Sequence, residues 1–218
     1  VYSTLPEDLA YDQLVDFGDK LLIPAMNDMH VHAPQLGNMG IAMDMQLLPW
    51  LNTYIFPEET KFADEAYAET IYHSFVSELW RHGTMRAAVF ATVHTPATHI
   101  LARAFNEAGM GALIGLVGMD RHTPATLCNT PAEWTAGMQT LIESLASMPL
   151  VKPIITPRFI PSCTPEMLRC MGEMAKQTLL PVQSHLSENQ QEIAWVHELE
   201  PEATCYGDAY YRYGLFGQ

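Results

Sequence analysis

Short apolar runs alternate along this chain with longer stretches in which apolar positions recur near helical spacing. Each run has the length of one buried strand, and the longest nearly apolar stretch, residues 108–119, is too short to span a bilayer. Strands and helices that alternate at about 30 residues or more per unit are typical of a parallel sheet covered by helices. The five strand-like runs span residues 21–30, 84–92, 112–119, 151–157 and 180–185.

Helical stretches separate these runs. In the first of them, residues 62–81, the apolar positions lie close to a helical repeat. Thr130-Pro131 and Thr164-Pro165 fit a helix N-cap followed by proline in the first turn, so they predict where two further helices begin. The remaining predicted helices span residues 97–108, 131–146, 165–177, 189–199 and 207–216.

The polar residues that could act in catalysis or metal binding fall at the carboxyl ends of the predicted strands. Active groups collect there in a (β/α)8 barrel, whereas a doubly wound sheet would also need a crevice at a switch point. The chain has no glycine-rich phosphate loop that would support nucleotide binding. The pattern therefore favours an α/β fold of the (β/α)8 TIM-barrel type. These strand-end residues are His30, His32, His94, Asp120, Arg158 and His185.

Only five strand–helix units are visible, and a closed barrel needs eight. Five open units would leave an unpaired parallel strand at each edge, which is an aggregation hazard. We therefore expect residues 1–218 to be a single partial barrel domain, holding about the first five strands of a longer protein.

Composition and charge narrow the possible partners. Eleven basic and twenty-five acidic residues give a formal net charge of −14. Such a surface repels phosphate backbones and anionic lipids, so nucleic acids and membranes are poor partners, while a small neutral substrate is acceptable. The four cysteines show no CxxC spacing, and no signal-peptide pattern opens the chain. Free thiols in the cytoplasm are the simplest interpretation.

A group of residues at two strand ends carries the candidate chemistry. In His30-Val31-His32, strand alternation aims both imidazoles at one side, where they can share a metal ion. His185 ends a later predicted strand, so it should lie at the same edge of the sheet as His30 and His32. Glu188 follows His185 by three residues. A divalent metal lowers the pKa of bound water towards about 7, and a carboxylate that takes the water's proton can deliver it to a leaving amine.

Each of these residues also has a structural interpretation. The segment around Glu188 fits a helix start, with Ser184 or Ser187 as the cap and the carboxylate near the positive end of the helix dipole. Arg158 fits a partner for a helix dipole or a carboxylate, and Gln35 fits a simple loop hydrogen bond. The residues alone leave both interpretations open.

Several stretches taken together resemble the guanine deaminases of the metal-dependent amidohydrolase superfamily over most of the chain. The His-x-His element belongs to the whole superfamily. Ala33-Pro34-Gln35, the Thr-Pro-Arg-Phe block at 156–159 and the Ser-His-Leu-Ser-Glu-Asn block at 184–189 narrow the resemblance to the guanine deaminases. The other matching stretches span 23–32, 48–51, 54–58, 90–95, 117–121 and 152–159.

The resemblance implies a (β/α)8 barrel with one zinc ion per subunit and a small β-sandwich formed from the two chain ends. It also implies hydrolytic deamination of guanine to xanthine and ammonia by a homodimeric full-length protein. Carried over position by position, it makes His30, His32 and His185 zinc ligands, Glu188 the catalytic proton-shuttling carboxylate, and Gln35, Arg158 and Phe159 contacts to the purine.

This sequence also departs from the family pattern. The family's fourth histidine and its aspartate come from the sixth and eighth strands, and neither His94 nor Asp120 fits those places by spacing. Residues 1–17 do not extend into the expected β-sandwich, so we expect truncation there also. We expect guanine deamination from the full-length protein, and weak zinc binding without deamination from these residues alone. The alternatives are an amidohydrolase acting on an oxidised purine, a pterin or another aminopurine, and a truncated, non-catalytic fragment.

Overall fold

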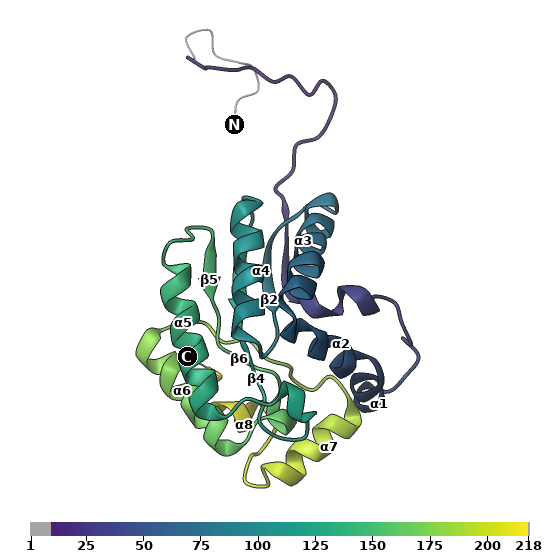
Figure 1. The fold of residues 1–218 in the computed structure, drawn as a ribbon, viewed down its shortest axis with the longest axis vertical. Coiled ribbons are helices and arrows are strands. Elements are labelled where there is room, and N and C mark those ends of the chain that lie inside the picture. Colours follow the sequence, from purple (N-terminus) through teal and green to yellow (C-terminus); the bar gives the residue numbers. More distant parts are fainter. Residues whose placement is uncertain (1–9, 218) are drawn as a thin grey trace.

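Four parallel strands form the main sheet in the computed structural model, which describes residues 10–217 (Figure 1). Each strand pairs with the next one along the chain, as expected for successive strand–helix units. Residues 1–9, which form part of the segment predicted to lack the upstream β-sandwich, lie outside the described residues. The strands are, in sheet order, β1 (Met26–His32), β2 (Thr84–Phe90), β3 (Gly111–Gly115) and β5 (Val151–Pro153).

Two of these strands continue after a short break. β4 (Val117–Gly118) follows β3 and β6 (Thr156–Pro157) follows β5, and the two short strands pair in parallel with each other. A single parallel bridge then joins Ile155 to Val182. Parts of all five predicted runs therefore lie side by side in chain order, which is the arrangement of consecutive strands in a barrel wall.

Strand β1 contains one irregularity that bears on the site. From Asp28 to Val31 it advances three residues, while the paired stretch of β2 advances two, from Ala87 to Val89. The extra residue forms a β-bulge, a local bend that re-aims the side chains around it. His30 lies within this bulge, and the register is regular again at His32.

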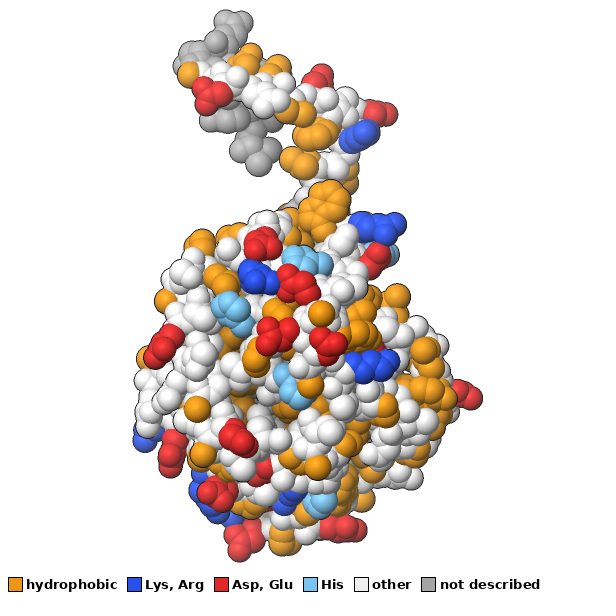
Figure 2. Space-filling model, in the orientation of Figure 1, with side chains coloured by type: hydrophobic (Ala, Val, Ile, Leu, Met, Phe, Trp, Pro, Cys, Tyr) orange, Lys and Arg blue, Asp and Glu red, His pale blue; other side chains and the backbone are white. Residues whose placement is uncertain are grey.

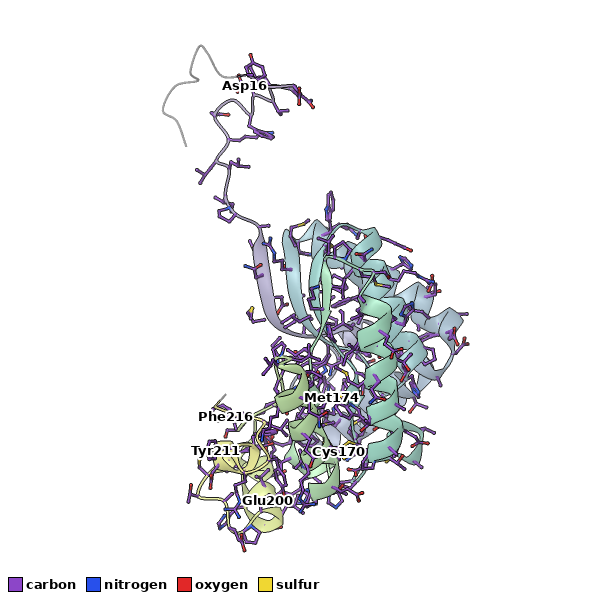
Figure 3. All side chains as sticks on the ribbon, turned by 90° about the vertical axis from the view of Figure 1, so that its left-hand side faces the viewer. Asp16, Cys170, Met174, Glu200, Tyr211 and Phe216 are labelled. Atoms are coloured by element: carbon purple, nitrogen blue, oxygen red, sulfur yellow. The ribbon has the colours of Figure 1, made fainter. Side chains whose placement is uncertain are left out.

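Helices cover one face of the sheet, as Figure 3 shows in a view turned by 90°. Four of them pack against one another in chain order along this layer. The turn after the last helix lies directly against Gly172 of the helix at 165–178, and only glycine fits there, because a Cβ would stand 1.8 Å from the carbonyl oxygen of Tyr213. The helices are α3 (Glu65–Arg81), α4 (Thr95–Glu107), α5 (Pro131–Leu145), α6 (Pro165–Thr178), α7 (Gln190–Leu199) and α8 (Tyr206–Tyr211).

Short helices fill the long connection between β1 and α3 and complete the loops. Residues 47–63 form an almost continuous helical path, which the sequence pattern did not predict. None of the described helices is long and apolar enough to cross a membrane. The short elements are η1 (Ala33–Asn38), α1 (Leu47–Trp50), η2 (Leu51–Ile55), α2 (Phe56–Thr60), η3 (Lys61–Ala63), η4 (Ala125–Leu127) and η5 (Ile160–Ser162).

Two apolar clusters form the core. The larger lies between the sheet and its helices and includes Phe105, Ile114 and Trp134. The smaller lies at the carboxyl ends of the strands, beneath the short helices of residues 47–63. Burial of these side chains fixes the strand ends that carry the polar residues. Members of the smaller cluster include Leu51, Ile55, Phe56, Phe90, Val117, Met119 and Phe159.

The structure corrects two of the predicted strands. Leu21, Leu22 and Ile23 are 86%, 80% and 60% exposed in an extended segment, and hydrophobic side chains are visible along it in Figure 2. No described strand pairs with them, so an apolar run alone does not make a buried strand there. In the predicted strand 180–185, only Val182 forms a bridge. The predicted helix 207–216 is shorter and ends at Tyr211.

Candidate active site

A cavity of about 450 Å³ opens at the carboxyl ends of the strands. The end of β1, helix η1 and the segments that follow β6 and Val182 form its walls. The structure brings together in this cavity all the residues that the sequence predicted for the site. They are His30, His32, Gln35, Arg158, Phe159, His185 and Glu188.

Three imidazoles meet on one side of the cavity, and we call His30, His32 and His185 the histidine cluster. One ring nitrogen from each lies within 4.8 Å of the other two, and the Nε2 atoms of His32 and His185 are 2.8 Å apart. The ring of Phe90, the last residue of β2, packs against all three at centroid distances of 4.9, 4.4 and 4.7 Å. This apolar backing removes water from one side of the rings and favours their uncharged form.

Burial sets the charge state of the histidine cluster. It lowers the pKa of His32 well below its usual value, and the neighbouring His185 and Arg158 lower it further. Burial also lowers the pKa of His185 to about 3, against a hydrogen bond to the Arg158 backbone that raises it. The pKa of His30 is lowered by partial burial, which Asp28 opposes. All three rings are therefore neutral at pH 7 and offer lone pairs.

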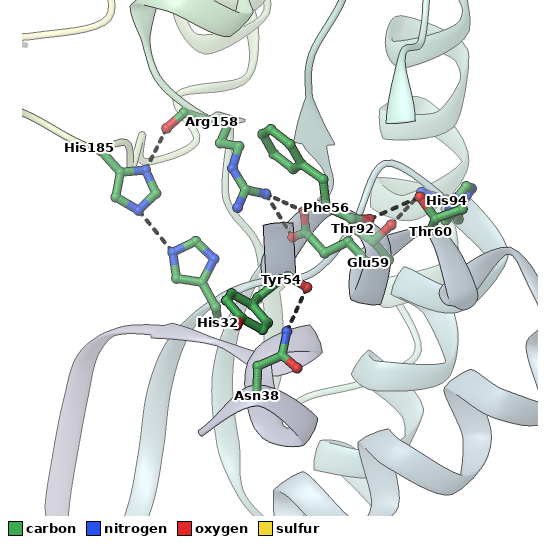
Figure 4. A network of polar contacts seen from close by, with 10 residues as sticks. All are labelled: His32, Asn38, Tyr54, Phe56, Glu59, Thr60, Thr92, His94, Arg158 and His185. Carbon is green, nitrogen blue, oxygen red and sulfur yellow. Dashed lines mark hydrogen bonds and ion pairs between the residues drawn. The ribbon is translucent and has the colours of Figure 1, made fainter. Parts of the chain in front are cut away.

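The hydrogen bonds of the histidine cluster fit a metal ion. His185 Nδ1 lies 2.6 Å from the carbonyl oxygen of Arg158, which only accepts, so Nδ1 carries the proton and Nε2 keeps a lone pair (Figure 4). That lone pair points at the ring of His32, whose buried Nδ1 has no partner among the described residues. Neutral imidazoles held by such a carbonyl are the usual ligands of zinc.

His94 does not join the histidine cluster. It precedes helix α4, and its backbone N–H bonds to the Thr92 hydroxyl at 3.2 Å. Its side chain lines a separate cavity with Val93, Cys128 and Glu133.

Arg158 lines the side of the cavity that faces the histidine cluster and is paired with an acidic residue that does not line it, and we call Arg158 and Glu59 the arginine pair. Arg158 Nη1 donates to Glu59 Oε1 at 2.7 Å and to Oε2 at 2.5 Å (Figure 4), and both side chains are almost fully buried. The guanidinium also lies 5.2 Å from the centre of the Phe56 ring. The carboxylate partner considered for Arg158 is thus present, while the same arginine faces the cavity.

Glu59 is the functional residue that sequence reasoning missed. It lies in helix α2, 99 residues before Arg158, and the recognised stretch Phe-Pro-Glu at 56–58 stops one residue short of it. The available signal was an acidic residue in a segment that is otherwise rich in buried apolar side chains. Such a residue requires a buried cation.

Gln35 and Phe159 complete the wall. Gln35 lies in helix η1, half-buried, and makes no side-chain hydrogen bond within the described residues, so the predicted loop bond is not formed there. Its amide remains available to both donate and accept. Phe159 is 6% exposed and packs in the smaller apolar cluster, with its ring at the cavity edge.

Glu188 stands at the cavity mouth, immediately before helix α7. Burial raises the pKa of its carboxyl, the nearby Glu192 raises it further, and Arg158 opposes them. The helix start considered for this segment is also real, but its cap is Asn189, which accepts from the Gln191 N–H at 2.8 Å. Ser184, one of the serines considered as the cap, instead donates to the Pro157 carbonyl at 2.7 Å.

Known proteins match this chain in sequence and in structure. The model of the amidohydrolase family matches residues 21–218. The chain is 39% identical over 209 residues to guanine deaminase of Dictyostelium discoideum, covering 95% of this chain and 46% of that protein. It is 38% identical over 205 residues to guanine deaminase of Escherichia coli, covering 93% of this chain and 46% of that protein. The chain therefore spans about half the length of these curated relatives.

The structure of this chain also resembles a solved guanine deaminase structure. Guanine deaminase from C. acetobutylicum, with guanine bound in its active site, superimposes with a TM-score of 0.96 at 42% identity. The match covers 99% of this chain and 52% of that one. This likeness confirms the predicted amidohydrolase-type barrel, of which the chain holds an incomplete part.

Proposed function

The chain belongs to the amidohydrolase family, and from that premise we propose that the full-length protein deaminates guanine to xanthine and ammonia with the help of zinc. The observation that carries this proposal is the meeting, in one cavity, of three neutral imidazoles with Glu188 and Arg158. The relatives named guanine deaminase and the neighbour with bound guanine support the choice of substrate.

The histidine cluster would hold the metal, and the amidohydrolase family is generally metal-dependent. When bound, zinc supplies a water molecule of lowered pKa for attack on the ring carbon. His185 is fixed for this role by the Arg158 carbonyl, and its Nε2 therefore faces the cluster.

Glu188 moves the proton. Its carboxylate takes a proton from the attacking water as the new C–O bond forms. It then delivers that proton to the amino nitrogen as the C–N bond breaks, so that ammonia leaves. The raised pKa of Glu188 suits both steps, because a shuttling group works best when its pKa approaches the operating pH.

The opposite wall would orient the purine. The guanidinium of Arg158 spends one nitrogen on Glu59 and keeps its other N–H groups for a carbonyl oxygen of the ring. The amide of Gln35 matches a purine edge that both donates and accepts, and the Phe159 ring packs against the flat base. Since the charges of the arginine pair cancel, this wall suits an uncharged ligand.

The test is guanine turnover by the full-length protein, compared with its Glu188→Gln variant. We expect kcat to fall by about 10²–10⁴-fold, because the amide cannot shuttle a proton. Glu198→Gln, on an exposed part of helix α7, is the matched control and should keep wild-type activity. Unchanged activity in Glu188→Gln would contradict the mechanism. Deamination of an oxidised purine or a pterin, without any of guanine, would replace the substrate and leave the residue roles intact.

We also place the protein in the cytoplasm as a homodimer without membrane or nucleic-acid partners. Its four cysteines form no disulfide among the described residues, and its net charge is −14. Sedimentation of the full-length protein tests the dimer, and a monomer at micromolar concentration would exclude it.

A further inference from the structure

Helices α5 and α7 begin with the same local device, a capping box. In α5, Glu133 Oε2 accepts from the Thr130 N–H at 2.8 Å, and Thr130 caps the helix in return. In α7, Glu192 Oε2 accepts from the Asn189 N–H at 3.1 Å, and Asn189 caps that helix. These reciprocal bonds satisfy free N–H groups at the helix start, and capping requires no further bond from the glutamate.

The carboxylate of α7 is placed very differently from that of α5. Glu133 is exposed, whereas Glu192 is fully buried. Glu192 Oε2 also accepts from the N–H of Glu188 at 2.8 Å, a shorter bond than the one that closes the box. Its Oε1 accepts from the hydroxyl of Tyr206 at 2.6 Å. Burying a carboxylate is costly, and α5 shows that capping does not require it.

The segment 185–188 carries Glu188 and is held at both ends. The bond from the Glu188 N–H to Glu192 holds its later end. Helix α8 holds the other end, because the hydroxyl of Tyr210 donates to the carbonyl of His185 at 2.8 Å. Tyr206 and Tyr210 stack in the same helix at 5.6 Å. Between the two held ends, Ser187 has a left-handed backbone with φ of 58°, which a non-glycine residue adopts only when its surroundings impose it.

We propose that Glu192 is the positioning residue that fixes the backbone of Glu188, so that the Glu188 carboxylate stands at the reacting atoms. The inference rests on the proposed function, because it gives Glu192 its role through Glu188. Capping of α7 is the simpler role, and Glu192 performs it as well. The added bond to Glu188, one residue before the cap, distinguishes the two roles.

The experiment uses the full-length protein. Glu192→Ala releases the Glu188 backbone, and we expect kcat for guanine to fall about 10²-fold with KM unchanged, since misplacing a catalytic group by about 1 Å costs that much. Glu192→Gln keeps an amide oxygen for both backbone N–H groups, and we expect it to recover most of that loss. Tyr206→Phe removes only the outer anchor and should lower kcat by a few fold without unfolding the protein.

Two controls separate positioning from helix capping. Asn189→Ala removes the cap of the same helix and leaves the bond between Glu188 and Glu192 in place, so its kcat should stay within about two-fold of wild type. Glu133→Ala opens the other capping box, whose carboxylate lines a separate cavity, and should keep wild-type kcat. Equal losses of kcat in Glu192→Ala and Asn189→Ala would overturn the proposal, as would wild-type kcat in Glu192→Ala.

Hydrogen exchange of the Glu188 amide gives a readout that does not depend on activity. The amide should be protected in the wild type and in Asn189→Ala, and exposed in Glu192→Ala. An unprotected amide in the wild type overturns the positioning role. A protected amide in a wild-type protein that does not turn over guanine overturns the proposed function and leaves the hold on Glu188 established.

Discussion

The two sides of the cavity follow opposite principles. The histidine cluster gathers three neutral bases, with one ring nitrogen from each within 4.8 Å of the other two. The arginine pair joins full opposite charges through two short hydrogen bonds. Under the proposed function, the first side offers its nitrogens to a cation, whereas the second neutralises its own charge and keeps N–H groups of Arg158 for an uncharged ring.

This difference determines where each wall gains its stability. Under the proposed function, the histidine cluster gains it from a metal ion that binds the folded state, so its contribution depends on metal concentration. The arginine pair gains it from its own partner, so its contribution depends on both residues being present. Changes to the two walls should therefore have different consequences.

The largest effect should come from breaking the arginine pair. Glu59→Leu leaves a buried guanidinium without its counter-charge, and we expect the free energy of unfolding to fall by about 3–5 kcal/mol. Urea denaturation monitored by tryptophan fluorescence measures this change.

The double variant Glu59→Leu with Arg158→Met is the control for this prediction. It removes both charges and fills the space with apolar side chains, so its stability should return close to that of the wild type. If the double variant is as unstable as Glu59→Leu alone, lost packing rather than the unpaired charge explains the effect.

A smaller effect should follow from metal binding at the histidine cluster. Zinc at 100 times its dissociation constant should raise the free energy of unfolding by about 2.7 kcal/mol, because it binds only the folded state. His32→Ala should abolish this increase. His94→Ala, which lies in a separate cavity, should retain it. A chelator titration followed by thermal melting tests both variants, and an increase that survives in His32→Ala would place the metal elsewhere.

Taken per pH unit, the smallest effect should be the acid sensitivity of the metal-free histidine cluster. The folded pKa of His185 is about 3, against about 6.5 in an unfolded chain, so between these values the unfolded state binds more protons. The free energy of unfolding should therefore fall as the pH falls from 6.5, by at most about 1.4 kcal/mol per pH unit for this group.

Comparison with a variant isolates this contribution. His185→Gln should have a shallower dependence of stability on pH between 6 and 4 than the wild type, and His197→Gln, an exposed residue of helix α7, should not. Equal slopes in all three proteins would show that His185 titrates normally in the folded chain.

Much of the fold could be predicted from the sequence because its signals are local. Alternating apolar runs and helical stretches predicted the parallel sheet, and Thr130 and Thr164 do cap helices α5 and α6. The histidine cluster could be predicted because parallel strands bring their carboxyl ends to one edge of a sheet. Each of these inferences needs only the residues within one or two elements.

The features that could not be predicted depend on distant partners. Glu59 meets Arg158 across 99 residues, and although an acidic residue among apolar neighbours in helix α2 calls for a cation, nothing there indicates which one. The run at 21–25 has the composition of a strand, but burial depends on neighbours that composition does not reveal. Glu192 looks like an ordinary helix-capping residue until its second bond, to Glu188, is seen.

The bulge in strand β1 determines which changes in length this part of the chain can accept. Met29 lies beside His30 in this bulge. Deleting one residue at that point would shift all the preceding strand residues by one position and turn their side chains to the opposite face. Insertions and deletions should therefore be rare at this position among relatives.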